Sequence, residues 1–193
     1  MEFDNEAAFG LLEKIKRGDE QAFATLYKSL SRRIFAFALN QVHDEGKAEE
    51  IVVDTMHEVW KKPEQFNGTS KLSTWVLGIA RFKVLNSFRD AKHNHDELNE
   101  EIAESVESEA HTPYEALVEV QREQGVKRCM AKLSDEHREC MHLVFYEGLA
   151  LAEIAELQSC PENTVKTRLF HARQKIKNCL RMLLESEGNT VPE

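Results

Sequence analysis

The chain has 193 residues, of which 41% are hydrophobic and 31% charged, and its formal net charge is −9; we expect one medium-sized domain or two small ones, folded and mainly helical. Eight glycines and four prolines are too few for an all-β protein with frequent turns. The longest apolar run, residues 35–39, is far shorter than the about 20 residues of a membrane span, and the acidic first residues are unlike a secretory signal, so we expect a cytoplasmic protein without membrane insertion.

Residues 12–60 are predicted to form helices. Asp19 precedes apolar residues at helical spacing and is predicted to be an N-cap. The pattern breaks at residues 43–46 and resumes over 48–60, where an apolar stripe alternates with acidic positions. Two lysines and Pro63 are predicted to end that helix, because cations favour the negative pole of a helix and proline cannot continue it.

The next window, residues 65–89, contains basic residues and no acidic one. Residues 66–71 form a polar loop, and Ser73 or Thr74 is predicted to cap a helix that runs to about Arg89. Aromatic residues alternate with the cations, a combination that suits opened DNA because cations follow the backbone and rings stack on unpaired bases. The alternatives are a solvated helix face and, for Phe66 and Trp75, plain core positions.

Most of the excess acid lies in one central stretch. Residues 92–124 contain two basic and ten acidic residues, whereas the segments on either side are nearly neutral. This composition, without a helical apolar stripe, predicts a flexible acidic linker. We therefore expect an all-α protein with two small helical domains, residues 1–91 and 122–193, joined by a linker over residues 92–121.

The C-terminal part predicts a series of helices. Amphipathic spacing runs from 114 to 133, Ser134 is predicted to cap the next helix, and Gly148 ends it. A short helix over 149–157, a turn over 158–160 and a new helix with Pro161 in its first position follow. The second of these helices has one apolar face and a neighbouring outward strip of cations, Thr167 and an aromatic residue, as in a helix that reads the DNA major groove. A purely structural helical hairpin is the alternative.

Neither a metal site nor catalytic chemistry is predicted. The four cysteines lie at positions 129, 140, 160 and 179 without a CxxC spacing, and we expect them to be reduced thiols. No glycine-rich phosphate loop, nucleophile elbow or pair of catalytic carboxylates is evident, so we expect no cofactor and no enzyme activity.

Four stretches resemble an extracytoplasmic-function sigma factor, a small alternative sigma subunit of bacterial RNA polymerase. They are 19–27, which resembles the start of sigma region 2, 48–60 (AEEIVVDTMHEVW), 66–89 (FNGTSKLSTWVLGIARFKVLNSFR) and 133–177, which resembles sigma region 4. The resemblance implies an initiation factor that binds core RNA polymerase, opened −10 DNA and the −35 duplex. It also implies a role in a stress response under the control of an anti-sigma factor.

The resemblance also implies site residues. Contacts with core polymerase would come from Glu50, Asp54 and Glu58. Opened −10 DNA would be bound by Asn67, Gly68, Thr69, Ser70, Lys71, Trp75, Arg81, Lys83, Asn86 and Arg89. The −35 duplex would be bound by Pro161, Asn163, Thr164, Lys166, Thr167, Arg168, Phe170, His171 and Arg173.

Some positions depart from the family pattern. Phe82 and Asn163 stand where asparagine and glycine are common, and Val144 and His171 take places usually held by arginine. These departures concern the promoter sequence that is read. Two other classes of protein remain as alternatives: an ordinary helix-turn-helix repressor or activator, which would leave residues 66–89 and the acidic linker without a function, and an enzyme.

Overall fold

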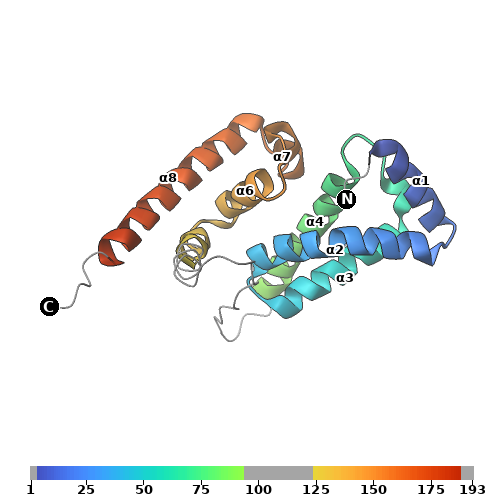
Figure 1. Ribbon diagram of the computed structural model, residues 1–193, viewed down its shortest axis with the longest axis horizontal. Helices are drawn as coiled ribbons and strands as arrows, with labels where there is room; N and C mark the ends of the chain where they lie inside the picture. Colours follow the sequence, from blue (N-terminus) through green and yellow to red (C-terminus); the bar gives the residue numbers. More distant parts are fainter. Residues whose placement is uncertain (1–3, 94–123, 188–193) are drawn as a thin grey trace, which may run out of the picture. The chain divides into compact units, whose positions relative to one another are not determined.

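The computed structural model describes residues 4–93 and 124–187, and within these ranges the regular structure is helical and contains no strand (Figure 1). This confirms the all-α prediction. The chain divides into two compact units, residues 1–103 and 104–193. The linker predicted for 92–121 lies outside the described residues except for its first two positions, which are the end of a helix. The domain limits at 91 and 122 therefore stay predictions.

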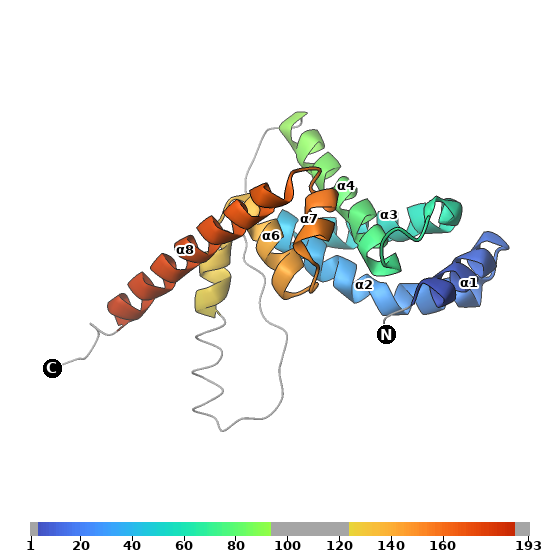
Figure 2. The ribbon, with the colours of Figure 1, turned by 90° about the horizontal axis from the view of Figure 1, so that it is seen from above.

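The N-terminal unit is built on a pair of long helices that pack side by side, with two further helices against them (Figure 2). Their buried faces meet in a core that includes Leu26, Phe37 and Met56. The elements in chain order are α1 (Asn5–Lys16), α2 (Glu20–Val42), α3 (Glu45–Lys61), the short 3-10 helix η1 (Pro63–Gln65) and α4 (Leu72–His93). Helix α4 packs on both α2 and α3, and α1 packs on α2 and η1.

The predicted helix ends in this unit are confirmed in part. The Asp19 carboxylate accepts hydrogen bonds from the backbone N–H groups of residues 21 and 22, both at 3.0 Å, as expected for an N-cap. Helix α3 ends at Lys61 before Pro63, as predicted. The prediction that Ser73 or Thr74 caps α4 is wrong. The helix begins at Leu72, so both residues lie within its first turn, and both side chains are buried.

The C-terminal unit contains helical residues 124–131 followed by α6 (Asp135–Phe145), α7 (Leu151–Leu157) and α8 (Glu162–Glu187). Helix α8 packs against both α6 and α7. Two predicted helix starts differ in detail. Ser134 is in the N-cap position, but its hydroxyl lies 2.9 Å from His137 Nδ1 and does not cap the backbone. Pro161 was predicted in the first position of the last helix, but α8 begins one residue later, and the Pro161 carbonyl accepts from the N–H of Thr164 at 2.8 Å.

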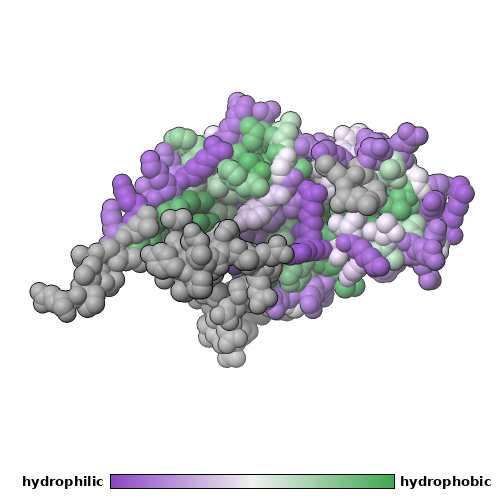
Figure 3. All heavy atoms as spheres, viewed as in Figure 1, coloured by the Kyte–Doolittle hydropathy of each residue, from purple (hydrophilic) through white to green (hydrophobic). Residues whose placement is uncertain are grey.

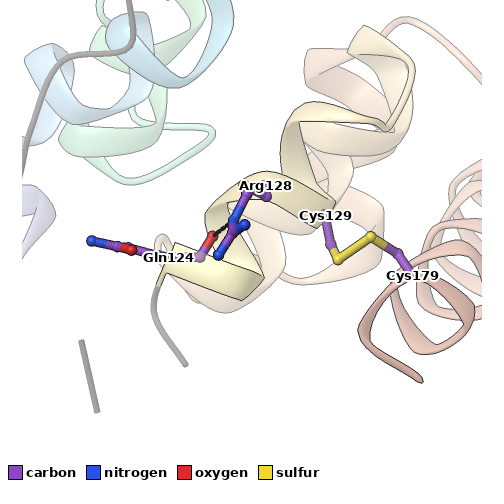
Figure 4. The surroundings of a disulfide bond; sticks show 4 residues. All are labelled: Gln124, Arg128, Cys129 and Cys179. Carbon is purple, nitrogen blue, oxygen red and sulfur yellow. Dashed lines mark hydrogen bonds between the residues drawn. A yellow bond between two sulfur atoms is a disulfide. The ribbon is translucent and has the colours of Figure 1, made fainter. Parts of the chain in front are cut away.

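A disulfide joins Cys129 in the first helical segment of this unit to Cys179 in α8 (Figure 4). The two Cα atoms are 5.8 Å apart, and both side chains are buried. The prediction that all four cysteines are reduced is therefore wrong for this pair and right for Cys140 and Cys160, which are free. Spacing along the sequence did not indicate the pair, because only helix packing brings positions that are 50 residues apart together.

Hydrophilic side chains are interspersed with smaller hydrophobic areas over the face of the molecule drawn in Figure 3. Within the described parts of the chain, every helix is too short or too polar to span a bilayer.

Candidate nucleic-acid interface

The polar loop 67–71 projects between η1 and α4 and is shaped by its own side chains. Asn67 Oδ1 accepts hydrogen bonds from the Thr69 N–H at 3.0 Å and from the Thr69 hydroxyl at 2.7 Å. Gly68 has φ +74°, a conformation that other residues rarely adopt. Asn67, Thr69 and Lys71 are exposed, and Gly68 and Ser70 are half-buried. The loop therefore presents polar groups to solvent from a fixed turn.

Aromatic rings form the floor of this loop. The Phe66 ring is buried and lies 5.5 Å from the half-buried Trp75 ring, centroid to centroid. The interpretation of Phe66 as a core residue is thus correct. Trp75 is only partly accessible, so a stacking role for it would use one edge or face of the ring.

The outer face of α4 is both basic and apolar. Asn86 is uncharged and half-buried. Arg89 is exposed, and its guanidinium donates a hydrogen bond to Asn86 Oδ1. Phe82 lies one or two turns before them on the same face and is 57% exposed. Arg81 and Lys83 are half-buried on the flanks of that face. Phe82 was not among the predicted site residues. We now include it in the candidate site because its ring is exposed at the centre of a cationic face.

One ion-pair cluster connects two of the predicted surfaces. Glu58 in α3 accepts a hydrogen bond from Lys62 at 2.8 Å and lies 4.0 Å from Lys83 Nζ in α4. The hydrogen bond from Lys62 lowers the pKa of the Glu58 carboxyl, because it stabilises the ionised form. This cluster connects the end of α3 to the middle of α4. Glu58 and Lys83 therefore stabilise the packing of the two helices in addition to lying on their predicted surfaces.

An apolar groove runs between α2 and α3. Its floor contains the rings of Phe23 and Trp60, whose centroids are 5.0 Å apart, and its rim includes Val53, which is 59% exposed. Glu50 and Asp54 are exposed on α3, Glu58 is half-buried, and the three follow each other at every fourth residue. The pair of helices thus offers an apolar groove next to an acidic stripe, a surface suited to a protein partner with apolar and basic side chains.

The helix-turn-helix predicted for 149–177 is present as α7, a turn and α8. Val165, Leu169 and Ala172 are buried on the inner face of α8 as predicted, whereas Ile176, predicted for the same face, is half-buried. Ser159 adopts a left-handed conformation in the turn, with φ 50°. The predicted contact residues Pro161, Asn163, Lys166, Thr167, Phe170, His171 and Arg173 are exposed, and Thr164 is half-buried. Lys166 pairs with Glu162 at 2.9 Å along the helix.

Arg168 is the exception among the predicted −35 residues. Its guanidinium points back to the turn, where Nη1 donates to Gln158 Oε1 at 2.6 Å and lies 3.7 Å from Cys160 Sγ. Gln158 is buried and donates to Glu139 Oε2 of α6 at 2.7 Å, and it accepts from Cys140 Sγ at 3.2 Å. Burial raises the pKa of the Cys140 thiol to about 11, so this donor keeps its proton. Arg168 therefore holds the turn in place from within.

Gln158 is a structural position that the sequence did not single out, since a lone glutamine in a turn resembles any surface residue. Replacing it with leucine is expected to lower the free energy of unfolding of the C-terminal unit by about 1–3 kcal/mol, because buried polar groups of Glu139 and Arg168 lose a partner. Urea unfolding, monitored by hydrogen exchange of the amides in α6 and α8, measures this change in the free energy of unfolding. Gln174→Leu, at an exposed position of α8, is the matched control, and an equal effect of both variants would contradict the proposed network.

An aromatic and cationic patch extends the exposed side of α8 onto α6. The Arg173 guanidinium carbon lies 5.5 Å from the ring centroid of Phe145, and Phe145 and Phe170 are mostly exposed. A guanidinium over the face of an aromatic ring is attracted by the negative charge of that face. Phe145 was not predicted to belong to the site. Among the residues that the structure describes, no cluster of three metal-ligating side chains occurs.

Comparison with known proteins identifies the two units. The family model for sigma-70 region 2 matches residues 26–94, and the model for sigma-70 region 4 matches residues 123–176, together more than half of the chain. The chain is 28% identical over 181 residues to RNA polymerase sigma-H factor of Pseudomonas aeruginosa, covering 90% of this chain and 94% of that protein. It is 26% identical over 172 residues to the extracytoplasmic-function sigma factor SigK of Mycobacterium ulcerans, covering 88% and 91%.

Solved structures have the same fold. The sigma factor RpoE of Bartonella quintana, crystallised with the anti-sigma factor NepR, matches with a TM-score of 0.68 at 21% identity over 82% of this chain and 96% of that one. CnrH, in complex with the cytosolic domain of CnrY, matches with a TM-score of 0.63 at 20% identity, over 89% and 96%. The region 2 match accounts for residues 66–89, which the repressor alternative left without a function. The chain therefore belongs to the sigma-70 family of RNA polymerase sigma factors, in its extracytoplasmic-function group.

Proposed function

We propose that the chain docks on core RNA polymerase through α2 and α3, holds opened −10 DNA with the loop 67–71 and α4, and binds the −35 duplex with α8. Sigma factors are non-enzymatic initiation factors, so this chain acts by binding and carries no catalytic step. The observation that carries the proposal is the presence, in one chain, of both sigma regions with their cationic residues on exposed helix faces.

The two DNA surfaces differ in chemistry, which supports different DNA targets. The surface of α4 and its loop combines Lys71 and Arg89 with the exposed ring of Phe82, and stacking on an unpaired base contributes about 1–3 kcal/mol per base. The surface of α8 presents cations and hydrogen-bonding groups along one helix, the geometry that enters a major groove. Arg168 is assigned the role of a positioning residue in this proposal, because its guanidinium is engaged with the turn.

Regulation by an anti-sigma factor, cytoplasmic location and a role in a stress response are parts of the same proposal. One structural neighbour, RpoE of Bartonella quintana, is a sigma factor in complex with an anti-sigma factor. The apolar groove between α2 and α3 supports such a partner, since an exposed apolar surface of this kind is covered when a protein docks on it. An anti-sigma factor that covers the groove would compete with polymerase.

The groove provides the test of polymerase binding. Val53→Glu places a charge on its apolar rim and is expected to weaken the binding of the full-length chain to purified core polymerase at least about tenfold, since a charge in an apolar interface is costly. Val126→Glu, at an exposed valine of the C-terminal unit, is the matched control and is expected to bind like the unmodified chain. Titration of fluorescently labelled protein measures both. Failure of the unmodified chain to bind core polymerase would refute the proposed function.

A further inference from the structure

We propose that helix α1 holds the loop 67–71, called the −10 loop below, in its DNA-binding conformation. In this proposal Asn5 and Phe9 are positioning residues for the loop. The inference rests on the function proposed above for the loop. Helix α1 precedes residue 26, where the match to the region 2 family model begins, so that match assigns it no role.

Two contacts join α1 to the loop at the same residue. The Asn5 side-chain amide donates a hydrogen bond from Nδ2 to the carbonyl oxygen of Gly68 at 3.1 Å, across 63 residues of sequence. The Phe9 ring lies against the α-carbon of Gly68, so closely that a β-carbon there would be 2.8 Å from Phe9 Cε2. Position 68 therefore favours glycine for two reasons: its φ is positive, and the Phe9 ring leaves no room for a side chain.

Phe9 also continues the aromatic floor of the loop. Its ring centroid is 5.1 Å from that of Phe66, which in turn lies 5.5 Å from Trp75. Phe9 is nevertheless 45% exposed, whereas Phe66 is buried. A large apolar ring at a solvent-exposed position contributes little to the core, so its place over the loop indicates a role in holding the loop.

The helix itself is firmly seated by a different face. Ala8, Leu12 and Ile15 are buried and follow helical spacing toward α2 and η1. Asn5 and Phe9, four residues apart, form the adjacent stripe that meets the loop. Because α1 is anchored by its buried stripe, the second stripe can hold the loop at a fixed place on the unit.

This arrangement has a consequence for promoter opening. Hydrogen bonds between Asn67 and Thr69 set the shape of the turn, and the α1 contacts set its position relative to α4. A loop that is already ordered loses less conformational entropy when a base enters it. Weakening the α1 contacts is therefore expected to slow or reduce promoter opening without affecting polymerase binding.

The experiment measures promoter opening by the full chain assembled with core polymerase, using a fluorescent adenine analogue in the −10 element. Asn5→Ala and Phe9→Ala are each expected to reduce the extent of opening severalfold, and the double variant about tenfold, since a hydrogen bond and a ring contact are lost. Binding to core polymerase and the thermal midpoint of unfolding are expected to remain near those of the unmodified chain. If Phe9→Ala alters the thermal midpoint, Asn5→Ala decides the question.

Gly68→Ala tests the contact directly. The added β-carbon meets the Phe9 ring and the positive φ, so a loss of opening of about tenfold or more is expected. In the background of Phe9→Ala the collision is gone and only the backbone penalty remains, so the double variant is expected to open promoters better than the product of the two single effects. Gly10→Ala is the matched control, because nothing lies within 4 Å of a β-carbon there.

Lys71→Ala separates failure of this inference from failure of the proposed function. If Lys71→Ala reduces opening while Asn5→Ala and Phe9→Ala do not, the loop binds DNA but α1 does not position it, and the inference is overturned. Strictly multiplicative effects of Phe9→Ala and Gly68→Ala would overturn it as well. If Lys71→Ala and Gly68→Ala both leave opening unchanged, the function proposed for the loop is itself wrong.

Discussion

Reduction of the Cys129–Cys179 disulfide is expected to lower the free energy of unfolding of the C-terminal unit by about 4 kcal/mol. The bond closes a loop between positions 50 residues apart, and a crosslink of that span removes much of the conformational freedom of the unfolded chain. The loop it closes contains α6, α7 and most of α8, so the crosslink constrains the whole helix-turn-helix.

The local packing also depends on this link. Gly125, one turn before Cys129, lies where a β-carbon would be 3.8 Å from Leu183 Cδ1, so the first helical segment of the unit rests closely on the C-terminal half of α8. Without the disulfide, apolar contacts such as that of Gly125 with Leu183 remain between this segment and α8. We expect the segment and the end of α8 to exchange amide protons faster after reduction than α6 and α7 do.

Peptide mapping without reductant, followed by hydrogen exchange at increasing urea, measures the effect. Cys179→Ala is expected to match the reduced unmodified chain and to be insensitive to reductant. Cys160→Ala removes a free, half-buried thiol and is the matched control, expected to keep the dependence on reductant. Equal stability of the oxidised and reduced chains would contradict the prediction.

Arg173→Ala is expected to weaken −35 recognition by about 1–3 kcal/mol, which corresponds to a loss of roughly 5- to 150-fold in promoter affinity. Arg173 is exposed on the outer side of α8, and the ring of Phe145 supports its guanidinium at 5.5 Å. The forked donors of a guanidinium are suited to the two acceptors of a guanine edge in the major groove. Loss of this group removes hydrogen bonds as well as charge.

Two further variants separate charge from base reading. Arg173→Lys keeps the charge but not the forked donor geometry, so it is expected to retain the salt dependence and to lose affinity for the preferred sequence. Lys175→Ala removes one charge from an exposed position of the same helix outside the predicted contact set. Promoter binding by the assembled polymerase at several salt concentrations measures all three. If Lys175→Ala lowers promoter affinity as much as Arg173→Ala does, Arg173 contributes only its charge and does not read a base.

Helical periodicity made much of the fold predictable. The inner face of α8 was identified from Val165, Leu169 and Ala172, because a self-contained helix buries residues three and four positions apart. Local chemistry also identified the Asp19 cap and the end of α3. These features are decided by neighbours within one or two turns, so one stretch of sequence contains the necessary information.

Exposure of a predicted contact residue was less predictable. The resemblance placed Arg168 and Arg173 in the same set of −35 contacts, yet one guanidinium is bound to Gln158 and the other lies over Phe145. The difference depends on which residues of α6 and the turn lie beside α8. Lys83 and Glu58, predicted for two different surfaces, likewise pair across α3 and α4.

The amino-acid sequence alone therefore determined the helical class, the helix-turn-helix and the two cationic segments, because spacing, caps and charge act over short distances along the chain. Tertiary structure decided which side chains remain available to partners, which two thiols meet, and which N-terminal residues contact the loop 67–71. Asn5 and Gly68, or Cys129 and Cys179, come together only through packing of whole helices, and the free energy of that packing is shared by many apolar residues that do not specify any one pair.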